Sequence, residues 1–342
     1  MINLATIYDV AARAGVSTAT VSRILSNDPT FSVKEETRRQ VCRAVEELNY
    51  MPYIRVKKNA GTKKDPDKKK VGCFITPNSG RRQVMLTYEH QLRELERSLT
   101  QHNMDLAFTT TEYDINSERD FAALAGQDTA ALVFMCNPPE PVYRRMRSLA
   151  PCAVGISCRM ADIDNVTYDK EQSAQAGVTL LAQHGRRKIA FIGGPGLPDG
   201  SIETSRRYRG YEFGMRQNGL AIHPDYVRNC DWNVEACYHQ TQEILRLPDP
   251  PDAIICVSDN MIFSVYRAIY EAGLQIPADI AVFSCKASHI AAFITPSITT
   301  TSVPVREMAD AAVDLLERRI RGEQFPLVDL MLRSTTVLND SI

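Results

Sequence analysis

Residues 6–27 read Thr-Ile-Tyr-Asp-Val-Ala-Ala-Arg-Ala-Gly-Val-Ser-Thr-Ala-Thr-Val-Ser-Arg-Ile-Leu-Ser-Asn and predict two short helices joined by a tight turn. Apolar residues recur at helical spacing in the first half. Gly15 marks the end of that half, because glycine readily adopts the left-handed conformation that closes a helix. Val16 can fill the space between the two helices, and Ser17 can cap the second one. The stretch therefore predicts a helix-turn-helix, which we expect the rest of the chain to control.

The second predicted helix presents small polar residues and one arginine on its outer face. Such a face suits the major groove of DNA, where hydroxyl and methyl groups meet base edges or phosphates and arginine can pair with guanine. An ordinary helical hairpin with a polar outer face would have the same spacing, so spacing alone leaves both interpretations open. We predict DNA contacts from Thr6, Tyr8, Ser17, Thr18, Ala19, Thr20, Ser22, Arg23 and Asn27.

A third helix is predicted over residues 35–50, where apolar side chains recur at i, i+3, i+4 and i+7; these are Val41, Ala44, Val45 and Leu48. Three helices can enclose a small core. Four pieces in this order resemble the DNA-binding head of the lactose and galactose repressor (LacI/GalR) family: Thr-Ile-Tyr-Asp-Val-Ala, Ala-Gly-Val-Ser-Thr-Ala-Thr-Val-Ser-Arg, Glu-Thr-Arg and Leu-Asn-Tyr-Met-Pro. The resemblance implies a sequence-specific DNA-binding regulator with its head at residues 1–50.

Charge is distributed unevenly along the 342 residues. Residues 1–70 hold 14 Lys and Arg against 8 Asp and Glu, which leaves 26 against 33 for the remainder, although the whole chain is nearly neutral. This asymmetry places a polyanionic partner at the N-terminal end.

Cysteine and histidine spacing argues against a metal centre. The nine cysteines form no C-x-x-C pair and the six histidines no i, i+4 pair, so we expect free thiols, no metal and no cofactor. No catalytic Ser/His/Asp order or carboxylate pair is evident, and we expect no enzymatic activity. Because no signal peptide or membrane-spanning run is evident either, we predict a cytoplasmic protein without a membrane partner.

Residues 51–70 are predicted to link the head to the body, with one short helix over residues 52–60. In the family, this hinge helix carries a leucine that enters the minor groove and kinks the duplex. The matching position here is Asn59, and Val56 stands where a small residue would let two hinge helices approach. We therefore predict that basic side chains hold the DNA backbone, with a solvated tether as the alternative; they are Lys57, Lys58, Lys63 and Lys64.

From residue 71 onward, short β-rich runs alternate with helical patterns, which predicts parallel sheets covered on both faces. Val166-Thr-Tyr-Asp, His184-Gly-Arg-Arg-Lys-Ile-Ala-Phe-Ile-Gly-Gly, Arg207-Tyr-Arg-Gly and Pro251-Asp-Ala-Ile-Ile-Cys-Val-Ser-Asp-Asn are similar to the family's effector domain. The resemblance implies a two-lobed α/β core like that of periplasmic sugar-binding proteins. We expect lobe 1 at about 71–165 and 303–330, and lobe 2 at about 166–302 and 331–342.

The resemblance also implies a small effector in the cleft between the lobes. Arg207 matches the family's effector-binding arginine, and its planar fork suits vicinal hydroxyls or a carboxylate. Trp232, the single tryptophan, matches a position where an aromatic ring can stack on a sugar. Asp259 could accept hydrogen bonds from hydroxyls. Each residue has a plainer alternative. Arg207 could lie on the surface, Trp232 could be a partly buried anchor, and Asp259 could cap a helix that begins at Met261.

Lys286 departs from the family, which usually places an acidic residue after the strand predicted at 280–283. A cation donates hydrogen bonds and cannot accept them. Together with Arg207, this lysine suggests an anionic effector such as a sugar phosphate or sugar acid, unless Lys286 points to solvent.

We therefore predict a sugar-responsive repressor that binds palindromic operator DNA as a homodimer, because one small head reads too few base pairs. The absence of a C-terminal heptad repeat favours a dimer over a coiled-coil tetramer. Effector binding could either weaken or strengthen DNA binding. A DNA-binding regulator without a small-molecule switch and a carbohydrate-binding protein or enzyme remain as alternatives.

Overall fold

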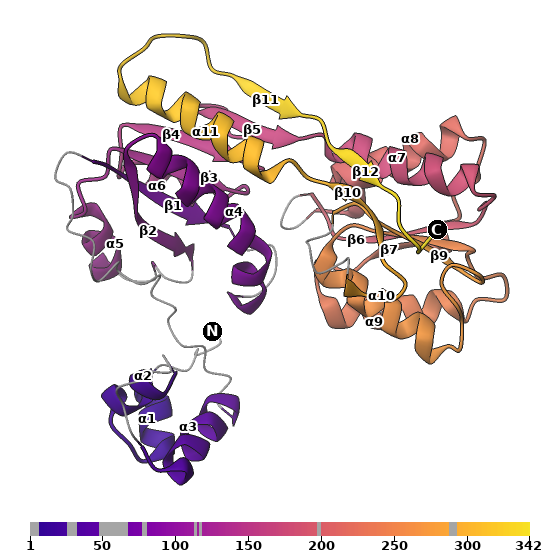
Figure 1. Ribbon diagram of the computed structural model, residues 1–342, viewed down its shortest axis with the longest axis horizontal. Coiled ribbons are helices and arrows are strands. Elements are labelled where there is room, and N and C mark those ends of the chain that lie inside the picture. Colours follow the sequence, from indigo (N-terminus) through magenta and orange to yellow (C-terminus); the bar gives the residue numbers. More distant parts are fainter. Residues whose placement is uncertain are drawn as a thin grey trace. The chain divides into compact units, whose positions relative to one another are not determined.

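The computed structural model describes residues 7–25, 33–47, 68–76, 81–112, 115, 118–196, 200–286 and 293–342 (Figure 1). The chain divides into two compact units, Met1–Asp65 and Pro66–Ile342. The hinge helix predicted at residues 52–60 lies outside the described residues.

The N-terminal unit contains helices α1 (Ile7–Ala14), α2 (Thr18–Leu25) and α3 (Glu35–Glu47). Each contributes two fully packed side chains to one small core, made of Val10, Ala11, Val21, Ile24, Val41 and Ala44. This arrangement confirms the predicted all-α helix-turn-helix head. The predicted C-terminal residues of the third helix, 48–50, lie outside the described part.

The turn between α1 and α2 has the geometry that its sequence predicts. Gly15 has a φ of 67°, in the left-handed region that favours glycine. The Val16 N–H donates to the Ala11 carbonyl (3.0 Å) and the Gly15 N–H to the Ala12 carbonyl (3.4 Å), a pair of bonds that defines a Schellman motif. Val16 then packs against the head core. These contacts fix the direction in which α2 leaves the turn.

The C-terminal unit contains two six-stranded sheets. Most of their strands are labelled in Figure 1. The first sheet has the strand order β11-β5-β4-β3-β1-β2 and all of its pairings are parallel. With its helices we call it lobe 1. Its strands are β1 (Lys69–Ile75), β2 (Met104–Thr111), β3 (Ala131–Met135), β4 (Cys152–Ile156), β5 (Asp164–Tyr168) and β11 (Asp329–Leu332); its helices are α4 (Arg81–Gln101), α5 (Glu118–Ala125), α6 (Glu140–Arg147) and α11 (Val305–Ile320).

The second sheet has the order β12-β10-β9-β8-β6-β7 and, with its helices, forms lobe 2. It is parallel except for β12, which pairs antiparallel with β10. Its strands are β6 (Ile189–Gly193), β7 (Val227–Asn229), β8 (Ala253–Cys256), β9 (Ala281–Ser284), β10 (Thr299–Ser302) and β12 (Thr335–Val337); its helices are α7 (Lys170–Gln183), α8 (Arg206–Gln217), α9 (Val234–Leu245) and α10 (Asp259–Glu271). The predicted two-lobed α/β core is confirmed.

The chain passes between the lobes three times. It leaves lobe 1 after β5, returns from β10 to α11, and crosses again between β11 and β12. Lobe 1 therefore includes residues 166–168 and 331–332, because β5 continues to Tyr168 and β11 to Leu332. These crossings make lobe 1 depend on residues far apart in the sequence.

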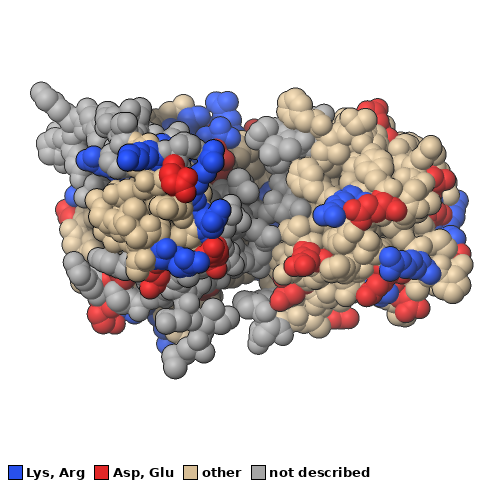
Figure 2. All heavy atoms as spheres, turned by 90° about the horizontal axis from the view of Figure 1, so that it is seen from below, with Lys and Arg blue, Asp and Glu red and all other residues tan. Residues whose placement is uncertain are grey.

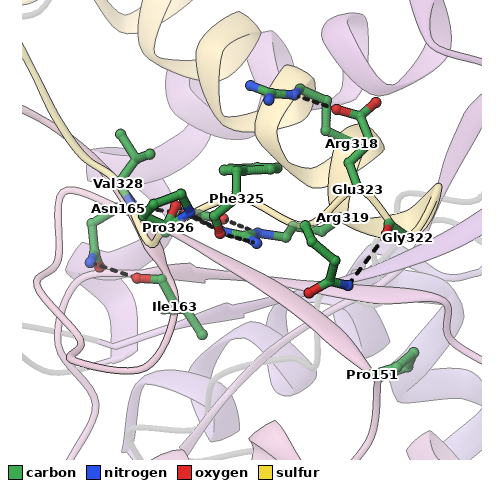
Figure 3. Close-up of polar contacts among 12 residues, drawn as sticks. Pro151, Ile163, Asn165, Arg318, Arg319, Gly322, Glu323, Phe325, Pro326 and Val328 are labelled. Carbon is green, nitrogen blue, oxygen red and sulfur yellow. Dashed lines mark hydrogen bonds and ion pairs between the residues drawn. The ribbon is translucent and has the colours of Figure 1, made fainter.

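An ion pair between a buried carboxylate and a partly buried guanidinium anchors the return of the chain to β11 (Figure 3). The Arg319 guanidinium donates to both carboxylate oxygens of Asp164, at 2.8 and 3.0 Å, and to the Phe325 carbonyl at 2.9 Å. The Val328 N–H donates to Asp164 Oδ1 at 2.9 Å. Asp164 thus joins α11, the following loop and β5.

Figure 2 shows acidic and basic residues interspersed on the visible face of lobe 2, with uncharged surface between them. On α10 of lobe 2, Arg267 and Glu271 form an exposed ion pair at 2.8 Å. Such a mixed surface gives no single-sign field that would attract a polyanion. In the described part of the chain, no helix is both long and apolar enough to span a lipid bilayer.

Candidate functional sites

Ser17 caps α2, as predicted. Its Oγ accepts a hydrogen bond from the Thr20 N–H at 3.1 Å and lies 2.9 Å from the Thr20 hydroxyl. Ser17, Ala19 and Arg23 are exposed, whereas Thr18 is half-buried. The predicted DNA contacts of these side chains remain predictions, and the cap gives Ser17 a structural role besides any contact with DNA.

Other predicted DNA-binding residues cannot be placed in the same detail. Tyr8 lies in α1 and Ser22 in α2, but the described atoms do not include their side chains. Six further predicted residues lie outside the described part of the chain: Thr6, Asn27, Lys57, Lys58, Lys63 and Lys64.

Substitution of Ser17 should separate its two roles. Ser17→Ala removes the cap and should lower the free energy of unfolding by about 1 kcal/mol, measured by urea denaturation. Ser17→Asp retains a capping oxygen and should restore most of this stability, yet its charge would repel DNA phosphates and weaken binding about tenfold in fluorescence anisotropy. Equal DNA affinity for Ser17→Asp and wild type would contradict a position at the DNA surface.

In the C-terminal unit, Arg207 connects the two lobes. It extends from α8 and donates through Nη2 to the hydroxyl of Tyr168, the last residue of β5, at 2.5 Å. Its guanidinium carbon lies 5.9 Å from the ring centres of both Tyr168 and Trp232. The structure therefore brings together two of the predicted effector-binding residues, Arg207 and Trp232.

Trp232 is held in a defined position beside this arginine. Its indole N–H donates to the Pro195 carbonyl at 3.0 Å, and both Asp231 (φ 47°) and Trp232 (φ 59°) adopt the left-handed region. A non-glycine residue in that region marks backbone that its surroundings hold in place. The loop after β7 thus presents one aromatic ring to the guanidinium.

Lys170 is a member of this site that we did not predict. As the first residue of α7, it donates through Nζ to the Ser157 carbonyl beyond β4 (3.2 Å), and Nζ lies 5.9 Å from the Tyr168 ring centre. Burial and the nearby Arg207 lower the pKa of Lys170 to about 8. The Val166-Thr-Tyr-Asp motif ends one residue before it, but no spacing rule connects Lys170 with Arg207.

Tyr88 and Cys136 lie beside these cations. The Tyr88 hydroxyl and Cys136 Sγ are 2.8 Å apart, and burial raises the pKa of Tyr88. Cys136 (φ 64°) and Ser157 (φ 59°) follow β3 and β4 at the carboxyl edge of the lobe 1 sheet. We define the junction site as Tyr88, Cys136, Ser157, Tyr168, Lys170, Arg207 and Trp232. Parallel sheets bind ligands at this edge.

The other two predicted effector residues are less completely placed. Helix α10 begins at Asp259 and its N-cap is Ser258, so the alternative of Asp259 as a cap for a helix starting at Met261 is wrong. The Asp259 side chain is not among the described atoms. Lys286 is half-buried, and its carbonyl accepts a hydrogen bond from Ser284 Oγ at 2.7 Å.

Comparison with known proteins assigns the chain to a family. Residues 6–53 match the model for bacterial regulatory proteins of the lacI family, and residues 178–339 match a periplasmic binding protein-like domain. The ribose operon repressor of Escherichia coli is 30% identical over 93% of this chain and 93% of its own length. The chain belongs to the lacI family. It is therefore a DNA-binding transcriptional regulator, as the resemblance of its head implied.

Solved structures share the fold of this lacI-family chain. The CelR–cellobiose complex is 24% identical with a TM-score of 0.69, covering 98% of this chain and 99% of its own. The lac repressor dimer bound to operator and the anti-inducer ONPF is 23% identical with a TM-score of 0.65, covering 98% of each chain. The lacI-family regulator thus has this fold along almost its whole length.

Proposed function

We propose that this lacI-family regulator represses carbohydrate-utilisation genes, that it binds a palindromic operator as a homodimer, and that a small sugar or sugar derivative controls it. The observation that carries the proposal is the Arg207–Tyr168 hydrogen bond between α8 of lobe 2 and β5 of lobe 1, beside Trp232. A ligand that competes for Arg207 would change a contact between the lobes. It would thereby favour one of two lobe arrangements and alter DNA affinity.

The names of the relatives support this proposal. One relative is a ribose operon repressor, one solved neighbour holds cellobiose, and another is a dimer on its operator. Two copies of the head related by a two-fold axis would read two half-sites of a palindrome. In this proposal the protein acts by binding and not by catalysis.

The first test is recovery of genomic DNA fragments by the purified protein at a fixed salt concentration, because phosphate contacts make affinity strongly salt-dependent. We expect one palindrome beside genes for sugar uptake or glycoside breakdown. Binding that is salt-sensitive but independent of sequence would contradict a specific repressor. If calorimetry detects no heat of binding for any metabolite in a panel, this result would instead support a regulator without a small-molecule switch.

Replacement of Arg207 should prevent the effector from changing the affinity for operator DNA. Arg207→Met removes the guanidinium fork, which should weaken effector binding about 30-fold or more, so that added effector no longer changes operator affinity. The matched control is Arg209→Met on the same helix, since Arg209 forms an exposed pair with Glu171 at 2.8 Å. A normal effector response in Arg207→Met, measured by anisotropy with labelled operator, would contradict the proposed site.

A further inference from the structure

We propose that the effector carries an anionic group, a phosphate ester or a carboxylate, and that Lys170 and Arg207 bind this group together. The inference rests on the proposed function and specifies the class of its ligand. In this proposal the second cation is Lys170 on α7, and Lys286 is not required.

The first argument is the charge around Lys170. Burial and two nearby cations, Arg207 and Arg206, lower the pKa of Lys170, and the neutral thiols of Cys136 and Cys158 lie near it. Glu171, the next residue, forms ion pairs with Arg206 (3.3 Å) and Arg209 (2.8 Å) on the α8 side. Two neighbouring cations that are partly shielded from water cost folding free energy, and an anion between them would offset that cost.

The second argument is unsatisfied hydrogen-bonding capacity at the same place. Within the described part of the chain, Arg207 Nε and Ser157 Oγ are buried and have no hydrogen-bond partner. Arg207 uses Nη2 for Tyr168, and the Ser157 carbonyl accepts from Lys170. A buried donor without an acceptor is costly, and the oxygens of a carboxylate or phosphate would supply acceptors to Nε, Nζ and the hydroxyl.

The third argument is geometric. Lys170 and Arg207 both come from lobe 2, and both donate to groups at the carboxyl edge of the lobe 1 sheet, namely the Ser157 carbonyl and the Tyr168 hydroxyl. An anion that binds the two cations would compete with both contacts between the lobes. Both cations now donate to neutral acceptors, and an anionic acceptor would add the attraction between opposite charges to these bonds.

The probe for this site is inorganic phosphate, and the reporter is the fluorescence of Trp232, the single tryptophan, beside Arg207. Phosphate titrated into the full-length protein at constant ionic strength should give a saturable change. Lys170→Met, which keeps chain length and removes the charge, should weaken this response at least about tenfold. The control Lys188→Met, which removes an ion pair with Asp249 in lobe 2, should respond like wild type.

A second readout is the pH dependence of sulfate binding, because the charge of sulfate stays constant across the range used. Deprotonation of Lys170 should weaken sulfate binding as the pH rises above about 8, and Lys170→Met should lack this loss. A far-ultraviolet circular dichroism spectrum equal to that of wild type shows that Lys170→Met is folded.

The outcomes separate the inference from the proposed function. Saturable binding with a higher affinity for phosphate than for acetate supports a phosphate ester as the effector. A higher affinity for acetate supports a sugar acid. No saturable response to either anion, or an unchanged response in Lys170→Met, overturns the inference. If a neutral sugar releases the operator while both anions are without effect, the proposed function stands and only the anionic ligand is wrong. Failure to retain any palindrome refutes the proposed function, whatever phosphate does.

Discussion

Asp164→Ala should lower the free energy of unfolding by about 3–5 kcal/mol, which makes it one of the most destabilising single substitutions in the C-terminal unit. The Asp164 side chain is 1% exposed and Arg319 is 18% exposed. Removal of the carboxylate leaves the partly buried guanidinium without its counter-ion and leaves the Val328 N–H without its acceptor. The loop between α11 and β11, shown in Figure 3, then loses the contacts of Asp164 that hold it against β5.

Urea denaturation of the full-length protein measures this loss. The matched control is Glu140→Gln, because Glu140 and Arg144 form an exposed i, i+4 pair in α6 at 2.6 Å, and such pairs contribute about 0.5 kcal/mol or less. Asp164→Asn should fall between the two, since its amide keeps one acceptor oxygen but no charge. A loss below about 1 kcal/mol for Asp164→Ala would mean that Arg319 finds other partners at little cost.

Gly210→Ala should destabilise the protein by about 3 kcal/mol and should also abolish the effector response. A Cβ at Gly210 would lie 2.1 Å from the Glu171 carbonyl oxygen and 2.8 Å from its carbon, so α7 and α8 would have to separate. The obstacle is backbone, which cannot rotate away as a flexible side chain can. Arg207 lies almost one turn earlier on α8, and displacement of this helix would break its bond to Tyr168.

Thermal unfolding and effector-induced operator release measure the two effects of Gly210→Ala. Gly126→Ala is the control, because the added methyl would lie 3.6 Å from the Ala122 carbonyl, an ordinary contact. We expect less than about 1 kcal/mol there. Unchanged stability and response in Gly210→Ala would show that α7 and α8 can move apart without disturbing the junction site.

Five elements of lobe 1 were not predicted, namely α6, β4, β5, α11 and β11. The β4 stretch, Cys152–Ile156, is short, and a short apolar run cannot be assigned to a strand or helix from periodicity alone. Helix α11 carried a usable signal in Val305, Met308, Ala309, Ala312, Val313 and Leu316, which are buried at helical spacing. A helix over these residues could therefore have been predicted from the sequence, and it is the helix with which the chain returns to lobe 1.

The sequence by itself determined the features that depend on neighbours in the chain. The head follows from helical spacing, a cap at Ser17 and a left-handed glycine at Gly15, all of which act within a few residues. The alternation of strands and helices likewise predicts parallel sheets. Arg207 and Trp232 could be proposed because each lies in a short segment that matches the family.

Only the tertiary structure decided which distant residues meet. Lys170 and Arg207 lie on separate helices and come together because α7 and α8 pack closely through Gly210. Asp164 meets Arg319 because α11 returns to the first sheet after the chain has passed through lobe 2 from α7 to β10. Helical and strand periodicities report which face of an element is buried, but they carry no information about its partner across the fold. The closeness of the two cations Lys170 and Arg207 in the junction site therefore results from packing, and the local sequence does not predict it.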